Sequence, residues 1–271
     1  RPWTSTMDWQ GHNLHFSDHV IHYYGNGNVG KPALVFCHGF SDNGLCWHRV
    51  ALRFTDQFDI YLLDARNHGQ SSRGIASAQD MTQDLADVIT ALELEPVIAV
   101  GHSMGAGTVA ALAAGYPHLV AKMILEDPAW SDEDDTQKTK SMRKRAAGFA
   151  KYLEMIARLS DDQLLAMGRA QHPSWSLEDF PSWVQSKREV DGFALKGLIR
   201  SPWQTLIENI TCPALLLYAD ETSDGIVQQK VVDQILSLNP CFQCKQITGA
   251  GHNLRREQFE AYITAIEAFL N

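Results

Sequence analysis

The sequence predicts an α/β fold: a mostly parallel sheet flanked by helices, with an inserted helical lid. Short apolar segments alternate with helical patterns through the first half of the chain and again near its end. Strands of a parallel sheet are apolar throughout because helices cover both faces of the sheet. Between the two alternating parts lies a charged and then helical stretch without a strand pattern. The 271 residues suffice for one large domain with an insert.

The first half of the chain begins with a predicted hairpin and continues with strands separated by helices. The hairpin covers residues 15–16 and 20–24. The apolar runs predict strands at 33–37 (ALVFC), 59–63 (DIYLL), 95–100 (EPVIAV) and 122–125. Helical patterns cover 79–94 and 106–115. This order is typical of strands that pair in parallel through helical crossovers.

After Pro128 the alternation stops, and we predict a helical lid over 129–208, inserted into a core formed by 1–128 and 209–271. Four tryptophans of the insert are candidates to line an apolar pocket, although they could equally be packing residues: Trp130, Trp175, Trp183 and Trp203. The basic run at 143–145 is interpreted as a solvated helix face. Alternation resumes with a strand at 214–218, a helix at 227–238, a strand near 243–247 and a helix at 255–270.

Composition excludes several classes of partner. The formal net charge is -9, which disfavours nucleic acids and anionic membranes because both attract basic surfaces. No run approaches the roughly 18 apolar residues of a membrane span, and residues 1–16 lack the apolar region of a signal peptide. The five cysteines are odd in number and scattered, which favours reduced thiols and a cytoplasmic location.

The most informative motif is the pentapeptide 101–105 (GHSMG), which has the pattern G-x-S-x-G. An apolar strand pattern precedes it and an Ala-rich helical pattern follows. A strand-turn-helix with serine at its apex exposes the hydroxyl on a tight, strained turn. The glycines leave room for neighbouring backbone, and the helix directs its positive end toward the serine. We therefore interpret Ser103 as a nucleophile rather than as part of an ordinary strand-helix turn.

Along nearly its whole length the sequence resembles the α/β-hydrolase superfamily. Four motifs carry the resemblance, in the order that the family has them: 38–40 (HGF), 64–71 (DARNHGQS), 101–105 (GHSMG) and 249–252 (GAGH). The first corresponds to the oxyanion loop and the second to a structural turn. The last two correspond to the nucleophile elbow and to the loop of the catalytic histidine.

The resemblance assigns roles that the chemistry of serine nucleophiles requires. A serine hydroxyl needs a base within hydrogen-bond reach, and His252, in a glycine-rich loop after the last strand, is the candidate. A carboxylate must then orient the imidazole. The oxyanion needs two preorganised N–H donors, which the resemblance assigns to the backbone of Phe40 and Met104. His38 is expected to brace the oxyanion loop.

The identity of the acid is left open by the sequence. In this family it usually follows the strand after the insert, in a G-x-x-D loop, but that slot holds Thr222 here. Asp220 comes too early and Asp224 two residues late. Some members carry the acid after the strand that follows the nucleophile helix, where this chain has Glu126 and Asp127. We favour Asp127 and keep the other three carboxylates as alternatives.

We predict no metal or organic cofactor. Two sets of potential metal ligands lack further ligands at metal-binding spacing: the pair Cys241 and Cys244, and four histidines of the opening hairpin, namely His12, His15, His19 and His22.

The predicted function is that of a serine hydrolase that cleaves an ester, lactone or amide of a small, partly apolar molecule through an acyl-enzyme. One alternative is a hydrolase of carbon–carbon bonds with the same triad. Another is a ligand receptor on a hydrolase scaffold. A haloalkane dehalogenase is disfavoured because Ser103 replaces the carboxylate nucleophile that it needs. The sequence does not predict an oligomeric state.

Overall fold

The computed structural model describes residues 8–200 and 202–271. Residues 1–7, on which part of the signal-peptide interpretation rests, and Ser201 of the predicted lid lie outside the described residues. The described chain forms an eight-stranded sheet. Its strands are β1 (Gln10–His15), β2 (Val20–Gly25), β3 (Ala33–Cys37), β4 (Asp59–Leu63), β5 (Val97–His102), β6 (Val120–Glu126), β7 (Ala214–Tyr218) and β8 (Phe242–Gln246).

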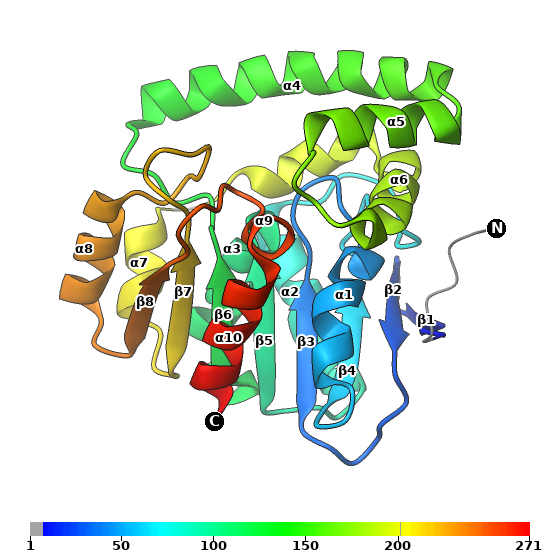
Figure 1. Cartoon of the computed structure of the whole chain (residues 1–271). Coiled ribbons are helices and arrows are strands. Elements are labelled where there is room, and N and C mark those ends of the chain that lie inside the picture. The colour runs from blue at the N-terminus through cyan, green and yellow to red at the C-terminus, as the bar shows by residue number, and fades with distance from the viewer. Residues whose placement is uncertain (1–7, 201) are drawn as a thin grey trace.

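The strands follow the spatial order β1-β2-β4-β3-β5-β6-β7-β8. The hairpin β1–β2 joins the sheet antiparallel to β4, and all later pairs are parallel. Parallel strands end at the same edge of the sheet, so the loops that follow β3, β5, β6, β7 and β8 meet along one rim (Figure 1). The predicted α/β fold with a mostly parallel sheet is confirmed.

Helices cover both faces of the sheet, as the apolar strands predicted. One face packs against α2 (Ala78–Ala91), α3 (Met104–Gly115), α7 (Trp203–Glu208) and α8 (Gln229–Leu238). The other packs against α1 (His48–Ala51) and α10 (Phe259–Leu270). In β3, Val35 contributes to the first apolar core and its neighbour Phe36 to the second. Successive side chains alternate between the two faces of a strand, so a strand that is buried on both must be apolar at every position.

The segment between β6 and β7 contains a helical insertion that lies across the rim of the sheet (Figure 1). Its main helices are α4 (Asp135–Arg158), α5 (Asp161–Gln171) and α6 (Phe180–Glu189). Capping boxes at Asp134 and Ser160 satisfy the first backbone N–H groups of α4 and α5. A small apolar core of its own holds the insertion together: Ile156, Leu164, Trp175, Phe180 and Trp183. The domain limits 1–128, 129–208 and 209–271 stay a prediction.

The predicted helix over 255–270 is divided into α9 (Leu254–Glu257) and α10. Gln258 separates them because its backbone leaves the helical conformation, with φ -136 and ψ 64. Its side-chain amide donates to the carbonyl of Gly249 at 3.4 Å. The short helix α9 therefore stays with the loop that carries His252.

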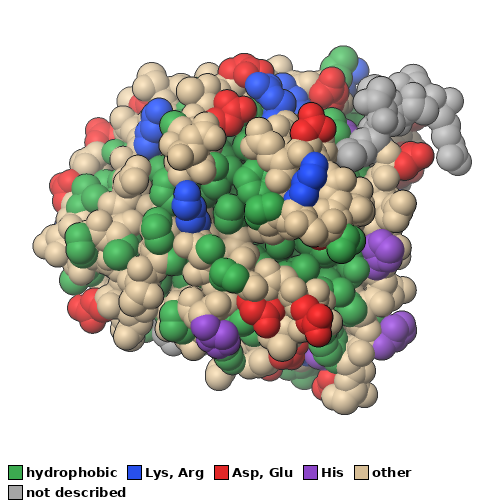
Figure 2. Space-filling view, turned by 90° about the horizontal axis from the view of Figure 1, so that it is seen from below, with side chains coloured by type: hydrophobic (Ala, Val, Ile, Leu, Met, Phe, Trp, Pro, Cys, Tyr) green, Lys and Arg blue, Asp and Glu red, His purple; other side chains and the backbone are tan. Residues whose placement is uncertain are grey.

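The face of the molecule opposite the insertion is mixed in charge. In the part of that face that the structure describes, Lys and Arg side chains are scattered among Asp and Glu and form no continuous basic area (Figure 2). Within residues 8–200 and 202–271, no helix combines the length and the apolar character that crossing a bilayer requires. The five cysteines, all of them in the described part of the chain, are free.

Candidate active site

Ser103 occupies a strained turn between β5 and α3. Its backbone has φ 50 and ψ -112, a conformation with positive φ that L-residues rarely adopt. The Ser103 N–H donates to the carbonyl of Glu126 at 2.9 Å, which ties the turn to the end of β6. The side chain is 9% exposed and stands at the N-terminus of α3, where the helix dipole favours developing negative charge.

The two glycines of the pentapeptide are required by close backbone contacts. A Cβ atom on Gly101 would lie 2.5 Å from the carbonyl oxygen of Gly105. A Cβ atom on Gly105 would lie 2.1 Å from the carbonyl oxygen of Cys37. Both distances are shorter than any tolerated contact, and the atoms met are backbone that cannot rotate away. The glycines thus let α3 begin directly against β3 and β5, which fixes the position of Ser103.

His252 and Asp127 form a buried hydrogen-bonded pair. The Nδ1 atom of His252 lies 2.6 Å from Oδ2 of Asp127, whose side chain is fully buried. The same carboxylate accepts the backbone N–H groups of Ile226 and Val227, each at 2.9 Å. A carboxylate only accepts, so His252 carries a proton on Nδ1, and in the neutral ring Nε2 is then the basic nitrogen.

The three alternative acids contact other groups. Asp224 accepts the backbone N–H of His252 at 2.9 Å, and Asp220 accepts that of Gly249 at 3.1 Å. Both therefore shape the histidine loop rather than orient the ring. Glu126 is buried and pairs with Arg255 at 3.3 Å. Of the four carboxylates, Asp127 is the one that contacts the imidazole of His252.

Two neutral histidines brace the loop after β3. His38 donates from Nδ1 to the Gly39 carbonyl at 2.8 Å and accepts the Ala65 N–H on Nε2 at 3.0 Å. His68 donates to the Arg66 carbonyl and accepts the Ser41 N–H at 3.1 Å. Burial lowers the pKa of His38 to about 4 and the pKa of His68 well below its usual value. Both rings are therefore neutral near pH 7, as accepting an N–H requires.

The two residues proposed from the sequence as oxyanion donors lie at the start of α3 and in the braced loop after β3. Met104 is the first residue of α3, so its N–H has no acceptor within the helix. Phe40 lies in the braced loop, and its ring packs against Phe149 of α4 at 4.8 Å between centroids. Phe40 and Ser103 line the same cavity.

That cavity, which we call the nucleophile cavity, has a volume of about 290 Å³ and lies between the sheet rim and the insertion. His252 lines it together with Ser103, and the insertion contributes Trp175 and Trp183. The other two tryptophans suggested for the pocket do not line it. Trp130 and Trp203 stack on each other at 5.9 Å in the core beneath the insertion. A tryptophan pattern in sequence does not distinguish a cavity wall from such a packing contact.

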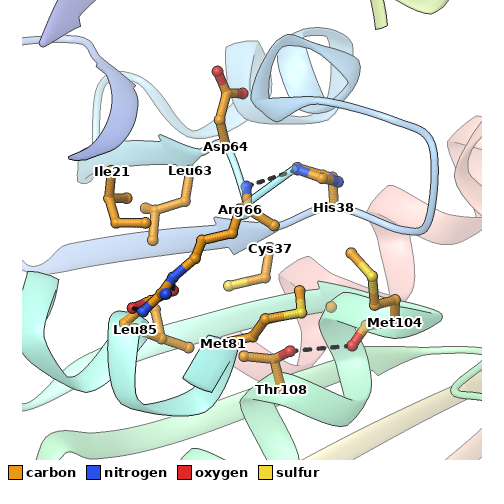
Figure 3. Close-up of a pocket in the computed structure, with 13 residues that line it drawn as sticks. Ile21, Cys37, His38, Leu63, Asp64, Arg66, Met81, Leu85, Met104 and Thr108 are labelled. Atoms are coloured by element: carbon orange, nitrogen blue, oxygen red, sulfur yellow. Dashed lines mark hydrogen bonds and ion pairs between the residues drawn. The ribbon is translucent and has the colours of Figure 1, made fainter. Parts of the chain in front are cut away.

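A second cavity lies on the opposite side of the elbow, between β3, β4, α2 and α3 (Figure 3). Its volume of about 30 Å³ suffices for no more than one or two waters. Apolar side chains such as Leu63, Met81 and Leu85 surround it, and Thr108 bonds the Met104 carbonyl at its edge (Figure 3). This second cavity is small and Ser103 does not line it, whereas Ser103 lines the nucleophile cavity directly.

Sequence reasoning missed a charged cluster next to the nucleophile. Asp42, from the loop after β3, forms ion pairs with Lys187 of α6 and with Arg255 and Arg256 of α9. Burial alone would raise the pKa of Asp42, but the three cations hold it well below its usual range. These residues are far apart in the chain and match no motif, so only their proximity in the fold reveals the cluster.

The hairpin histidines have other partners. His22 contacts Asn13 at 2.7 Å, and His19 lies within hydrogen-bond distance of Asp18 and Asp84. Among the described residues, no group of three or more His, Cys, Asp or Glu side chains is arranged to hold a metal ion.

A serine on a strand-to-helix turn of a parallel sheet, next to a histidine-carboxylate pair, is the arrangement of an α/β-fold hydrolase. The profile of the α/β hydrolase fold family matches residues 32–255. The chain belongs to this family, which confirms the resemblance found in the four sequence motifs. Membership of this family does not by itself determine a reaction or a substrate.

Comparison with single proteins identifies more specific similarities. The chain is 26% identical to N-formylmaleamate deformylase of Pseudomonas putida over 271 residues, which cover 93% of this chain and 92% of that protein. A shorter match of 96 residues, 33% identical, links it to an uncharacterized protein of Mycobacterium tuberculosis and spans 28% of that protein's length. The crystal structure of E-2-(acetamidomethylene)succinate hydrolase superposes with a TM-score of 0.80 at 20% identity, covering 97% of this chain and 99% of the other. That identity shows the shared fold alone.

The neutral state of His38 predicts a pH dependence of stability. Its pKa is about 4 in the folded protein and 6.5 ordinarily, so between these values the unfolded chain binds more protons. The free energy of unfolding should therefore fall as the pH drops from 6.5 toward 4. Glutamine can accept the Ala65 N–H but does not titrate. When the pH is lowered from about 7 to 5, the free energy of unfolding of wild type should fall by about 2 kcal/mol more than that of His38→Gln. Urea unfolding at the two pH values measures this difference.

The control for this measurement is His118→Gln, at an exposed position, which should keep the wild-type pH dependence. Equal losses in wild type and His38→Gln would contradict the neutral buried ring.

Proposed function

We propose that the protein is a serine hydrolase that cleaves a carboxylic ester, lactone or amide of a small, partly apolar molecule. The observation that carries the proposal is the contact of 2.6 Å between His252 Nδ1 and Asp127. It leaves the second ring nitrogen of His252 as a base in the cavity that Ser103 lines. Ser103, His252 and Asp127 are then the nucleophile, the general base and the orienting acid.

In the proposed reaction, Ser103 Oγ attacks the substrate carbonyl carbon while His252 Nε2 takes the hydroxyl proton. The tetrahedral intermediate collapses, His252 returns the proton to the leaving group, and an acyl-enzyme remains. Water activated by the same nitrogen then releases the acid. Asp127 stabilises the imidazolium in both steps and keeps Nδ1 protonated.

The N–H groups of Phe40 and Met104 serve as the oxyanion donors in this proposal. Met104 supplies an unsatisfied N–H at the positive end of α3, and the bracing of the Phe40 loop by His38 and His68 supports a preorganised second donor. Residues 129–208 act as the lid: Trp175 and Trp183 line the nucleophile cavity from above the sheet rim, where they exclude water and contact the substrate.

The type of bond is inferred from the relatives. N-formylmaleamate deformylase and (acetamidomethylene)succinate hydrolase are named for reactions on N-acyl compounds. They support an amide, with esters and lactones following the same acyl-enzyme route. A small-molecule substrate, no organic cofactor and the cytoplasmic location suggested by cysteine usage complete the proposal.

Replacement of the nucleophile tests the proposal directly. Ser103→Ala should reduce ester and amide hydrolysis by about 10⁶-fold while circular dichroism stays that of the wild type. Intact-mass analysis after treatment with a fluorophosphonate should show one adduct on wild type and none on the variant. Wild-type rates in Ser103→Ala, or an adduct on that variant, would remove Ser103 from the role of nucleophile.

The choice of acid is tested by a matched pair of substitutions. Asp127→Asn should lower kcat by about 10³–10⁴-fold because the amide imposes the wrong imidazole tautomer. Asp224→Asn keeps an oxygen that accepts the His252 backbone N–H, so we expect less than about a tenfold loss. Steady-state kinetics on one activated ester compares the two variants. A larger loss in Asp224→Asn would assign the acid to the loop after β7.

A further inference from the structure

The nucleophile cavity has an excess of positive charge. Arg145, Lys187 and Arg256 line it, and Asp42 is the one carboxylate among its lining residues. The chain as a whole has a net charge of -9, so the cavity is opposite in sign to the protein. Charges of one sign gathered in a concave site attract and concentrate ligands of the other sign.

In the charged cluster, the cations outnumber the carboxylates with which they form direct ion pairs. Asp42 contacts Lys187 at 3.3 Å and both Arg255 and Arg256 at 3.1 Å. Arg255 also pairs with Glu126 at 3.3 Å. Three cations thus share two carboxylates. The nearby Asp179 pairs directly with Arg49 at 3.4 Å, and Arg49 also pairs with Glu178 at 3.6 Å, so the negative charge of Asp179 acts on Arg256 as well.

Arg256 has two donors without a partner, whereas Arg255 has one, its Nε atom, among the described residues. The Arg256 side chain is only 2% exposed. The guanidinium lies over the ring of Trp175, with 4.4 Å between Cζ and the ring centroid. Its Nη1 atom contacts Asp42 and Asn253, each at 3.1 Å. Within residues 8–200 and 202–271, Nε and Nη2 have no hydrogen-bond partner.

These two nitrogens form the edge of a guanidinium that holds a carboxylate with two parallel hydrogen bonds. The same protein shows this pairing elsewhere. Nε and Nη2 of Arg66 bind the two oxygens of Asp84, each at 2.6 Å. A buried charged donor without a partner is destabilising. Both nitrogens are covered by protein atoms, so a small shift of the Arg256 side chain toward the cavity would let a planar anion satisfy both at once.

We propose that Arg256 binds a carboxylate of the substrate, and that the substrate is therefore an ester or amide with a free carboxylate apart from the bond that is cleaved. This inference rests on the proposed serine hydrolase function. In a cavity of about 290 Å³, one side of the substrate is held by Arg256 and the other presents its carbonyl to Ser103. Because Ser103 and Arg256 line the same small cavity, the site selects short molecules that have a carboxylate at one end and the scissile carbonyl at the other.

The other two cations have different roles. Lys187 donates to the carbonyl and hydroxyl of Ser41, at 2.7 and 2.9 Å, in addition to Asp42, so it positions the loop after β3. Arg145 lies on the exposed part of α4, 6.0 Å from the ring centroid of Phe40, and attracts anions at the cavity mouth. The basic run at 143–145 is therefore not only a solvated helix face.

Two esters of equal length and different charge test the proposal: p-nitrophenyl valerate and mono-p-nitrophenyl glutarate. Wild type should prefer the anionic ester by at least about tenfold in kcat/KM, since a charge-assisted pair contributes about 1.5–3 kcal/mol. Arg256→Gln should remove most of that preference, and Arg256→Lys, which keeps the charge without the fork, should retain part of it. The measured quantity is the ratio of kcat/KM between the two esters.

The matched control is Arg169→Gln, which removes an exposed positive charge of α5 outside the nucleophile cavity. It should keep the wild-type ratio. An equal fall of the ratio in this variant, or no preference in wild type, would overturn the proposal. If neither ester is cleaved and no fluorophosphonate adduct forms, the serine hydrolase function itself is wrong.

If Arg256→Gln does not fold, inhibition and binding measurements on wild type and on Ser103→Ala test the carboxylate site instead. Glutarate should inhibit the wild-type hydrolysis of p-nitrophenyl valerate competitively, and the neutral glutaramide should inhibit it at least about tenfold more weakly. Glutarate should also raise the Tm of Ser103→Ala. Equal inhibition by the two compounds would overturn the carboxylate site, whatever the behaviour of the Arg256 variants.

Discussion

The carboxylate of Asp127 joins three loops of the sheet rim, and the arrangement of the site depends on it. The residue follows β6 with a positive φ of 39, and its oxygens accept two N–H groups from the loop after β7 and one from the histidine loop after β8. The carboxylate is fully buried, so each of these bonds replaces a contact with water. Loss of any one of these three hydrogen bonds would leave the buried carboxylate with one hydrogen-bond donor fewer, which is destabilising. The three loops are therefore held close to this residue.

A second constraint is the close contact of backbone at the elbow. Two glycines bring α3 against β3, and His102 then donates from Nε2 to the carbonyl of His252 at 2.9 Å. The nucleophile loop and the histidine loop are therefore joined by a hydrogen bond besides facing one cavity. The buried histidines His38 and His68 each donate through one nitrogen and accept through the other, a pattern that a charged ring cannot provide.

The sequence predicted most strands of the sheet, but the first strand of the hairpin was predicted at 15–16, whereas β1 is Gln10–His15. The catalytic roles of Ser103 and His252 stay predictions. The limits of β3 and β7 follow from fully apolar runs, and those of β4 from a run that is apolar after Asp59. Ser103 and His252 were singled out by short glycine motifs that restrict the backbone. Asp127 could be predicted only as one of four carboxylates, because the choice depends on how the loop after β7 folds over β6. Arg256 could not be predicted at all: its role arises from Asp42 and Trp175, which approach it only in three dimensions.

The stack of Trp130 on Trp203 has a consequence for how this protein can diverge. The two rings lie where the chain leaves β6 for the insertion and where it returns toward β7, and Trp203 Nε1 donates to the Ser131 carbonyl at 3.1 Å. The ends of the insertion are thereby fastened together on the core. A segment anchored in this way can change its length and sequence while the strands beneath keep their places. The insertion can thus vary in sequence, and with it the ligands that bind beneath it, while the turn that carries Ser103 keeps its structure.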